Sequence, residues 1–496
     1  MRNIGCPFQK LAPRPLQSHR HNYTAIKRAR LGRKAGWMST ATLRSETDAR
    51  HWRHERESVP PIDHPIGFIP ALFSGGDSRI ATNPHTGLNK YLCPAMPAPD
   101  LVCASSCTAS PISVQGFDRA AEAFADIALA SSPRQRADRL AALTDQIEAR
   151  LLGYFGVGAL ARAFLCPSGT DALLTTAMLL AAEQPGAAVT AILPAASETG
   201  TGVPLAAVCR VFDGPDSGTS LTDGTSTTVE IPLRSADGSP RCDDEVNAAF
   251  AAAAAAAPGR AIVYLTHGTK TGLIAPVAPP PGADVIVDAC QARIEPEAVA
   301  AYLRRGWPVV VTGSKFFGGP AFSGAVLFPR ARLPAVAQGP LPAAPRDSVR
   351  LGTALRWTAA LAVIDAFEPV AVTMAEILSR RITVIEQALA SNPVLVTVGG
   401  LRPCGPGWAD QPSIFTFGVR DPMDLRRKLS VAELRPLYEH LARKGVLLGQ
   451  PVGLGSFGGL RLAIGARDLL DSSDDSGLAR VFAVLEEMTA PSLPRR

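Results

Sequence analysis

Residues 283–327 read ADVIVDACQARIEPEAVAAYLRRGWPVVVTGSKFFGGPAFSGAVL. This stretch contains two short apolar runs, 285–287 and 309–311, and polar or small residues follow each run at once. Short runs rich in β-branched residues, bounded in this way, are typical of buried parallel strands. A helical pattern over 295–305 separates the two runs. The stretch therefore predicts a strand-helix-strand unit of an α/β sheet.

A carboxylate and an amine stand at the ends of these two strands. Asp288 ends the first run, and Lys315 follows the second within four residues. In an open α/β sheet, ligands bind at the carboxyl ends of the strands. Pyridoxal phosphate needs a lysine that holds it as a Schiff base and an acid that keeps its ring nitrogen protonated. Taken alone, the stretch also permits a surface lysine and a helix-capping aspartate.

Composition limits the class of protein. The chain has 496 residues, of which 46% are hydrophobic and 19% charged, as is ordinary for a globular protein with two or three domains. No apolar run approaches the ~20 residues that a membrane helix needs. The net charge is +6, but residues 1–37 hold nine Lys or Arg and no acid, so the rest is mildly acidic. We therefore expect neither nucleic acid nor a membrane as a partner.

The basic leader and the cysteines bear on the compartment. Residues 1–57 are predicted to be a disordered leader and extension. The Arg-rich start resembles a mitochondrial transit peptide, but it lacks a sustained amphipathic pattern, which favours Met38 as the true start and a cytoplasmic protein. The nine cysteines form no CxxC pair and have no His partner at metal-ligand spacing, so we expect reduced thiols and no metal site.

The remaining chain divides into three predicted regions. Residues 58–130 are rich in Pro, Gly and Ser and predict an extended arm followed by the first helix. Arg79 in this arm is a candidate for substrate contact; the alternative is a dimer arm with solvated charges. Residues 131–335 alternate strands with helices, which predicts a three-layer α/β domain around a mostly parallel sheet. The strands expected in this domain include 205–212 and 228–232.

A proline-rich segment at 330–349 begins a smaller α+β domain, which we place at 336–496. We expect a long helix over 354–392, broken near 368–369, and two shorter strands with a helix beyond it. A turn in the large domain, Ser168-Gly169-Thr170, joins a short strand to an apolar helix. Free N–H groups and hydroxyls at a helix start suit a phosphate, although many ordinary strand-to-helix turns look the same.

Several turns agree in order and spacing, and together they resemble the class V aminotransferase and cysteine desulfurase family of fold type I enzymes, which use pyridoxal phosphate. The resemblance covers about residues 110–465. Asp288-Ala-Cys-Gln291 resembles the turn whose aspartate meets the ring nitrogen and whose glutamine meets the ring hydroxyl. Residues 314–320, SKFFGGP, resemble the lysine turn. The resemblance implies that Lys315 and Asp288 are catalytic.

The resemblance implies further contacts. The cofactor-binding positions besides Asp288, Gln291 and Lys315 are Ser168, Gly169, Thr170, Thr269, Thr312, Ser314 and Thr353. Thr353 matches a residue that reaches the phosphate of a neighbouring subunit, which implies a homodimer with shared sites. Arg461 matches the arginine that binds the α-carboxylate of the substrate; the alternative is a solvated arginine on a strand.

Three departures from the family decide the expected reaction. The family's ring-stacking His or Trp is replaced by Ser197-Glu198-Thr199, so ring stacking either falls to another group, for which Thr199 is the candidate, or is absent. Ser314 stands where many relatives carry His or Gln. The nucleophilic cysteine of the desulfurases is replaced by Leu448, and a desulfurase needs this thiolate.

We therefore expect an aminotransferase that acts on an amino acid, with a keto-acid acceptor. A lyase that uses the same cofactor for elimination, C–S or C–C cleavage is the alternative, because loss of the Cα proton leads to either outcome. A binding or regulatory module with the same fold is a third reading, against which the intact Lys315 and Asp288 argue.

Overall fold

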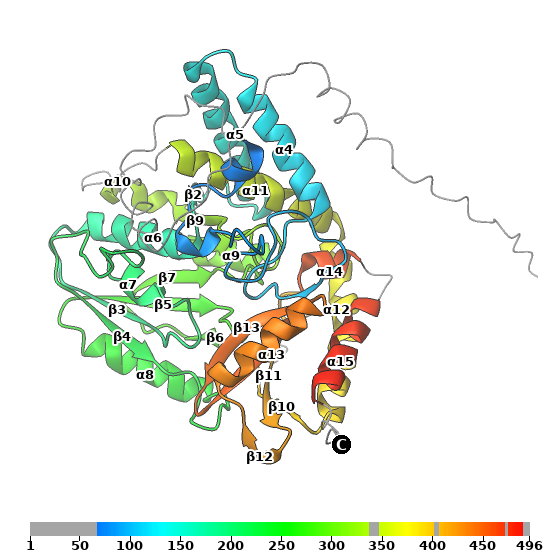
Figure 1. The fold of residues 1–496 in the computed structure, drawn as a ribbon. Coiled ribbons are helices and arrows are strands. Elements are labelled where there is room, and N and C mark those ends of the chain that lie inside the picture. The colour runs from blue at the N-terminus through cyan, green and yellow to red at the C-terminus, as the bar shows by residue number, and fades with distance from the viewer. Residues whose placement is uncertain (1–66, 337–346, 401–405, 472–474, 490–496) are drawn as a thin grey trace, which may run out of the picture. The chain divides into compact units, whose positions relative to one another are not determined.

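The computed structural model describes residues 67–336, 347–400, 406–471 and 475–489. The predicted leader, residues 1–57, lies outside these ranges. The described chain forms two sheets with their covering helices (Figure 1).

The larger sheet has the strand order β2-β9-β8-β7-β5-β3-β4, with β6 paired to β5. Neighbours from β4 to β8 run parallel, whereas β9 and β6 are antiparallel to their neighbours. The strands are β2 (Ala161–Cys166), β3 (Val189–Pro194), β4 (Ser226–Ile231), β5 (Arg260–His267), β6 (Ile274–Ala275), β7 (Asp284–Ala289), β8 (Val309–Thr312) and β9 (Gly324–Pro329).

Helices cover both faces of this sheet. Ile286 of β7 packs in the same core cluster as the apolar side of α6 (Gly169–Glu183), whereas Val285 and Val287 pack in the cluster that contains α8 (Asp243–Ala255) and α9 (Pro296–Arg304). Figure 1 shows α6 and α8 on opposite sides of the strands. Alternate residues of a strand point to opposite faces, so both sets are buried. The predicted three-layer, mostly parallel sheet is confirmed.

The smaller sheet has the order β1-β13-β14-β11-β10, with β12 paired to β11. Its first strand comes from the N-terminal arm, because Val102–Ala104 pairs in parallel with Val446–Leu448. The strands are β1 (Val102–Ala104), β10 (Leu395–Thr397), β11 (Ile414–Asp421), β12 (Asp424–Lys428), β13 (Val446–Leu454) and β14 (Phe457–Ala463). The arm is thus built into the C-terminal sheet.

A helical layer accompanies the two sheets. The break predicted near 368–369 is present in it: Glu368–Thr373 forms a 3₁₀ turn between α11 (Asp347–Phe367) and α12 (Met374–Ser391). The other helices are α3 (Phe68–Leu72), α4 (Val114–Ala128), α5 (Pro133–Tyr154), α7 (Val203–Ala206), α10 (Leu333–Val336), α13 (Val431–Arg443), α14 (Ala466–Leu470) and α15 (Ser476–Thr489), with 3₁₀ turns at Ser78–Ile80 and Arg330–Arg332.

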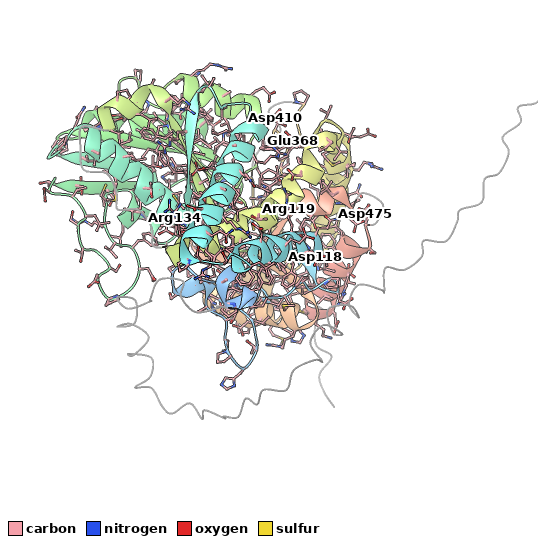
Figure 2. All side chains as sticks on the ribbon, turned by 90° about the horizontal axis from the view of Figure 1, so that it is seen from above. Asp118, Arg119, Arg134, Glu368, Asp410 and Asp475 are labelled. Carbon is pink, nitrogen blue, oxygen red and sulfur yellow. The ribbon has the colours of Figure 1, made fainter. Side chains whose placement is uncertain are left out.

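Ion pairs join the first helices to α11. Arg119 of α4 and Arg150 of α5 both pair with Asp365, and Arg150 also pairs with Glu368. Figure 2 labels Arg119 and Glu368 in this region of the surface. No helix of the described ranges is both long enough and apolar enough to cross a membrane.

Two expectations from the sequence are wrong. Residues 205–212 form no strand: the short helix α7, with Pro204 in its first turn, ends at Ala206, and buried turns follow it. The apolar residues of this segment are buried by a short helix and turns, and not by pairing with a neighbouring strand. The C-terminal region has five strands rather than two, because β12 is polar and exposed and β14 contains adjacent glycines, so neither shows an apolar strand pattern.

Candidate functional site

A cavity of about 360 Å³ opens at the carboxyl ends of the parallel strands of the large sheet, beside β13, β14 and the N-terminal arm. Many residues that the sequence singled out line it together. They are Ser168, Gly169, Thr170, Asp288, Thr312, Ser314, Lys315, Arg461 and Arg79. A larger cavity of about 620 Å³ elsewhere in the described chain contains neither Lys315 nor Asp288 in its wall.

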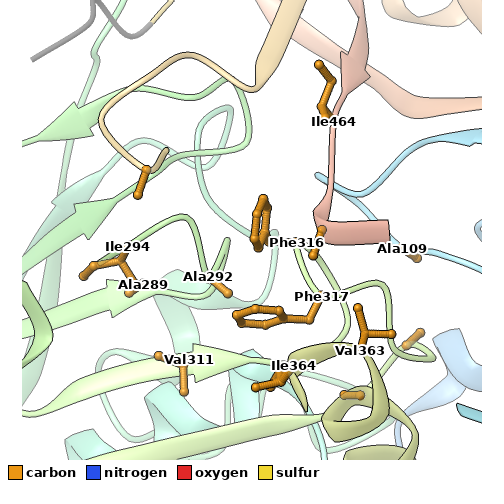
Figure 3. Close-up of a cluster of buried hydrophobic side chains, with 14 of the residues drawn as sticks. Ala109, Ala289, Ala292, Ile294, Val311, Phe316, Phe317, Val363, Ile364 and Ile464 are labelled. Carbon is orange, nitrogen blue, oxygen red and sulfur yellow. The ribbon is translucent and has the colours of Figure 1, made fainter. Parts of the chain in front are cut away.

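Packing on both sides of Lys315 fixes its position. Phe316 and Phe317 are buried, and Phe316 stacks on Trp408 with 4.3 Å between ring centroids. Figure 3 shows both phenylalanines inside the apolar cluster that contains Ala292, Val363 and Ile364. On the other side, a Cβ at Gly313 would lie 2.5 Å from the Cβ of Ala360 in α11.

Lys315 is the half-buried residue of this otherwise buried turn, 312–317. Because the backbone is held by the flanking aromatic residues and the close helix approach, the amine is presented to the cavity by a rigid support.

Asp288 is the next-to-last residue of β7, the strand beside β8. It lies opposite Val310 of β8, is 7% exposed, and its Oδ1 accepts a hydrogen bond from the backbone N–H of Cys290 at 3.0 Å. Thr312 Oγ1 donates to the carbonyl of Cys290 at 2.7 Å, which ties the ends of the two strands together. The carboxylate and the amine therefore project from neighbouring parallel strands into one space.

The N-terminus of α6 forms the third wall. Ser168 caps this helix, since its Oγ accepts from the N–H of Asp171 at 3.1 Å and donates to the carboxylate of Asp171 at 2.6 Å. The N–H groups of Gly169 and Thr170, in the first turn, cannot bond within the helix. A Cβ at Gly169 would lie 2.7 Å from Cys290 Sγ, so glycine is what lets the helix start reach the strand ends. This arrangement suits a phosphate.

Arg461 of β14 is a buried cation with neutral partners. It is 2% exposed, which excludes a solvated side chain. It donates to the carbonyl of Gln450 at 2.8 and 3.1 Å, to the carbonyl of Lys270 at 3.2 Å and to Thr108 Oγ1 at 2.9 Å. Within the described ranges no carboxylate pairs with Arg461, and a buried guanidinium in this state favours an anionic ligand.

Arg79 differs from Arg461 because it already has a carboxylate partner. Its Nε donates to Asp77 at 2.8 Å, and its guanidinium lies 5.1 Å from the ring centroid of Phe322. Arg79 therefore lines the cavity with its positive charge already neutralised by Asp77.

Four predicted cofactor contacts do not line the cavity: Thr199, Thr269, Gln291 and Thr353. Gln291 Nε2 donates to the carbonyl of Cys107 at 3.0 Å, and its Oε1 accepts from Arg293 at 3.1 Å. Thr353 is buried and accepts from Arg356 of its own helix at 3.4 Å. The homodimer inferred from Thr353 stays a prediction.

Thr269 bonds a buried carboxylate, that of Glu198, which directly precedes Thr199 in the chain. Glu198 is 1% exposed and accepts hydrogen bonds from Arg234 Nε at 2.8 Å and from the hydroxyls of Thr269 and Thr271, each at 2.6 Å. The Thr199 hydroxyl is buried and has no hydrogen-bond partner among the described residues. Glu198, the middle residue of the triplet at the family's stacking position, is therefore used for an internal network.

Sequence reasoning missed several residues of the cavity wall, and Lys270 and Cys107 are the chemically active ones near its interior. Lys270 Nζ donates to the carbonyl of Ala196 at 2.8 Å. Burial and the nearby charge of Arg461 lower the pKa of Lys270 to about 8; Lys315 adds to this effect, and Glu198 opposes it. The sequence did contain a signal for Lys270, because this lysine lies in the turn 267–272, which directly follows a predicted strand. Cys107 had no such signal, since only the pairing of β1 with β13 brings it here.

The donors on this wall fit pyridoxal phosphate. An amine, a carboxylate on the adjacent strand and a helix N-terminus surround one cavity, and these are the groups that the aldehyde, the ring nitrogen and the phosphate require. A ring-stacking group and a partner for the ring hydroxyl were predicted at Thr199 and Gln291, and these two side chains are not on the wall.

Comparison with known proteins agrees with this architecture. No family model and no curated protein matches the sequence. Solved structures do match.

A mutant of C-DES with glycine covalently linked to the PLP cofactor is 13% identical, with a TM-score of 0.53 over 78% of this chain and 96% of that one. The complex of the cystine C-S lyase C-DES with cysteine persulfide is 14% identical, with a TM-score of 0.51 over 78% and 97%. The apo cysteine desulfurase of Thermococcus onnurineus NA1 is 12% identical, with a TM-score of 0.52 over 79% and 95%.

At these identities the likeness shows the fold alone. The chain has the fold of the fold type I pyridoxal phosphate enzymes.

Proposed function

We propose that this chain is a pyridoxal phosphate enzyme that acts on amino acids, and that its reaction is transamination. One observation carries the proposal: Lys315 and Asp288 project from neighbouring parallel strands into a cavity that the start of α6 also lines. The fold supports it, because solved structures with this architecture include one with glycine linked to the cofactor.

Each group of the wall has a distinct task in this proposal. Lys315 Nζ would hold the cofactor aldehyde, Asp288 would hold the proton on the ring nitrogen, and the N–H groups of Gly169 and Thr170 would bind the phosphate. When bound, pyridoxal phosphate supplies an electron sink for charge that develops at the substrate Cα.

Arg461 would bind the α-carboxylate of the substrate and so orient the Cα–H bond. The Lys315 amine is the base placed to take that proton, because the turn lacks the histidine that many relatives carry before the lysine. Rigid packing of Phe316 and Phe317 keeps the amine in this place.

The binding step can be tested by absorbance. The purified chain with added pyridoxal phosphate should show a visible band that borohydride removes, and Lys315→Ala should lack this band. Asp288→Asn should retain fold and weaken cofactor binding, since an amide cannot hold the ring proton by charge. A wild-type preparation that stays colourless with added cofactor would contradict the proposal.

A lyase reaction is the second candidate, and one observation favours it. Cys107 lines the cavity, although Leu448, at the desulfurase cysteine position, is fully buried on β13. The Cys107 thiolate could attack the sulfur of a cysteine-like substrate: the new S–S bond leaves a persulfide on Cys107, and the substrate carbon keeps the electron pair of the broken C–S bond and takes up a proton. Incubation with an amino-acid panel, with and without a keto acid, separates the two reactions: transamination requires the acceptor, whereas elimination proceeds without it. Cys107→Ala should abolish sulfur transfer only.

A further inference from the structure

The cavity wall is strongly cationic. Asp288 is the one carboxylate among its lining residues, and the cations are Arg79, Lys90, Lys270, Lys315, Arg435 and Arg461. Arg79 is compensated by Asp77, and Lys90 and Arg435 are exposed at the mouth. The interior therefore holds Lys270, Lys315 and Arg461 against a single negative charge, and like charges so close together are costly unless anions bind between them.

Lys270 is held in position by two backbone carbonyls, one bonded to its backbone N–H and one to its side-chain ammonium. Its N–H donates to the carbonyl of Glu198 at 2.8 Å, and its Nζ donates to the carbonyl of Ala196 at 2.8 Å. The Glu198 carboxylate is occupied by Arg234, Thr269 and Thr271, and Lys270 forms no ion pair within the described ranges. One ammonium donor is used by Ala196, so two remain for a ligand.

Lys270 is also coupled to the carboxylate-binding arginine. Arg461 donates to the carbonyl of Lys270 at 3.2 Å, so the two cations approach the same cavity from adjoining backbone. In the proposed function, Lys315 and the helix start serve the cofactor, and Arg461 serves the α-carboxylate. Lys270 is then a cation without an assigned anion.

We propose that Lys270 binds a second acidic group, so that the substrates of this site are amino acids with an anionic side chain, of the aspartate or glutamate class. This inference rests on the proposed function and deepens it. Lys270 acts here as a specificity-determining residue: it contacts the side-chain carboxylate and takes no part in proton transfer at Cα.

The test uses the holoenzyme and a pair of unreactive ligands of the same size, succinate and its monoamide, which differ by one charge. Calorimetry should show that succinate binds about 10- to 100-fold more tightly, as expected for a hydrogen bond to a charged group. Lys270→Met should reduce the preference to less than about threefold, and Lys270→Arg should retain most of it. Lys444→Met, which removes a surface lysine paired with Glu487, is the matched control and should change nothing.

The outcomes separate this inference from the function beneath it. Equal binding of the two ligands to wild-type holoenzyme, or an unchanged preference in Lys270→Met, contradicts the inference and leaves the cofactor assignment intact. Loss of the cofactor band in folded Lys270→Met also contradicts it, because Lys270 would then serve the cofactor. A wild-type chain that takes up no pyridoxal phosphate overturns the proposed function and, with it, the inference.

Discussion

The turn that carries Lys315 and the turn that carries Lys270 present two amines to one cavity, but they are built differently. The first is held by apolar packing of Phe316 and Phe317 next to it in the chain. The second is held by hydrogen bonds to residues 196–198, about seventy positions away in sequence. A site supported by local packing can be predicted from a short stretch, whereas one supported by distant polar contacts cannot.

Removal of the amine from the first turn should have the largest effect. Lys315→Ala should lower kcat/KM by about 100- to 10,000-fold, since a positioned base is worth this much. Steady-state kinetics on the preferred amino acid would measure it. An unchanged thermal midpoint would show that the loss is chemical, and near wild-type turnover would contradict the role of Lys315.

Removal of the aromatic packing beside Lys315 should lower the stability of the fold. Phe316→Ala should lower the free energy of unfolding by about 3–5 kcal/mol, because it empties a fully buried aromatic site. Urea denaturation measures this, with Leu129→Ala, at a side chain 80% exposed, as the control that should shift little. A small shift in both variants would mean that packing does not hold the lysine turn.

The hydrogen bonds that support the Lys270 turn should contribute less to the free energy of unfolding than the apolar packing that supports the Lys315 turn. Glu198→Gln should cost about 1–3 kcal/mol, as it leaves the buried Arg234 without its charged partner. It should also reduce the preference for succinate over its monoamide, because the loop that holds Lys270 loosens. If stability falls while the preference is untouched, Glu198 does not position Lys270.

The charge of Lys270 should give the smallest effect, a gradual dependence on pH. Burial and Arg461 lower its pKa to about 8, so the ammonium is charged below that pH and neutral above it. The preference for succinate should therefore be full near pH 7, where the ammonium is charged and both carboxylates of succinate are ionised, and it should decline as the pH rises through 8. Lys270→Arg should remove the decline, since arginine stays charged. A flat profile for wild type would contradict this account.

Much of the fold could be predicted because its signals are local. The runs 285–287 and 309–311 are the centres of β7 and β8, and both are buried on two faces. The failures are long-range. Residues 205–212 looked like a strand, but their burial comes from turns. The pairing of 102–104 with 446–448 brings Cys107 to the cavity, and no pattern near Cys107 indicates it.

The same distinction applies within the site. Lys315 and Asp288 lie directly after apolar strands, so their place at the sheet edge followed from strand direction. The family resemblance placed Thr199, Thr269 and Gln291 at the cofactor, but the cavity wall contains none of the three. Thr269 bonds the buried Glu198 instead, and Gln291 bonds the buried Arg293. Side chains in hydrogen-bond networks depend on partners that a single stretch does not reveal.

In the proposed function Lys315, and not Lys270, holds the cofactor. The most direct test is to incubate the chain with pyridoxal phosphate, reduce it with borohydride so that the bond to the lysine becomes permanent, digest it, and locate the added mass by mass spectrometry. The account predicts one modified peptide, with the addition on Lys315. An addition on Lys270, or none on either lysine, would contradict it.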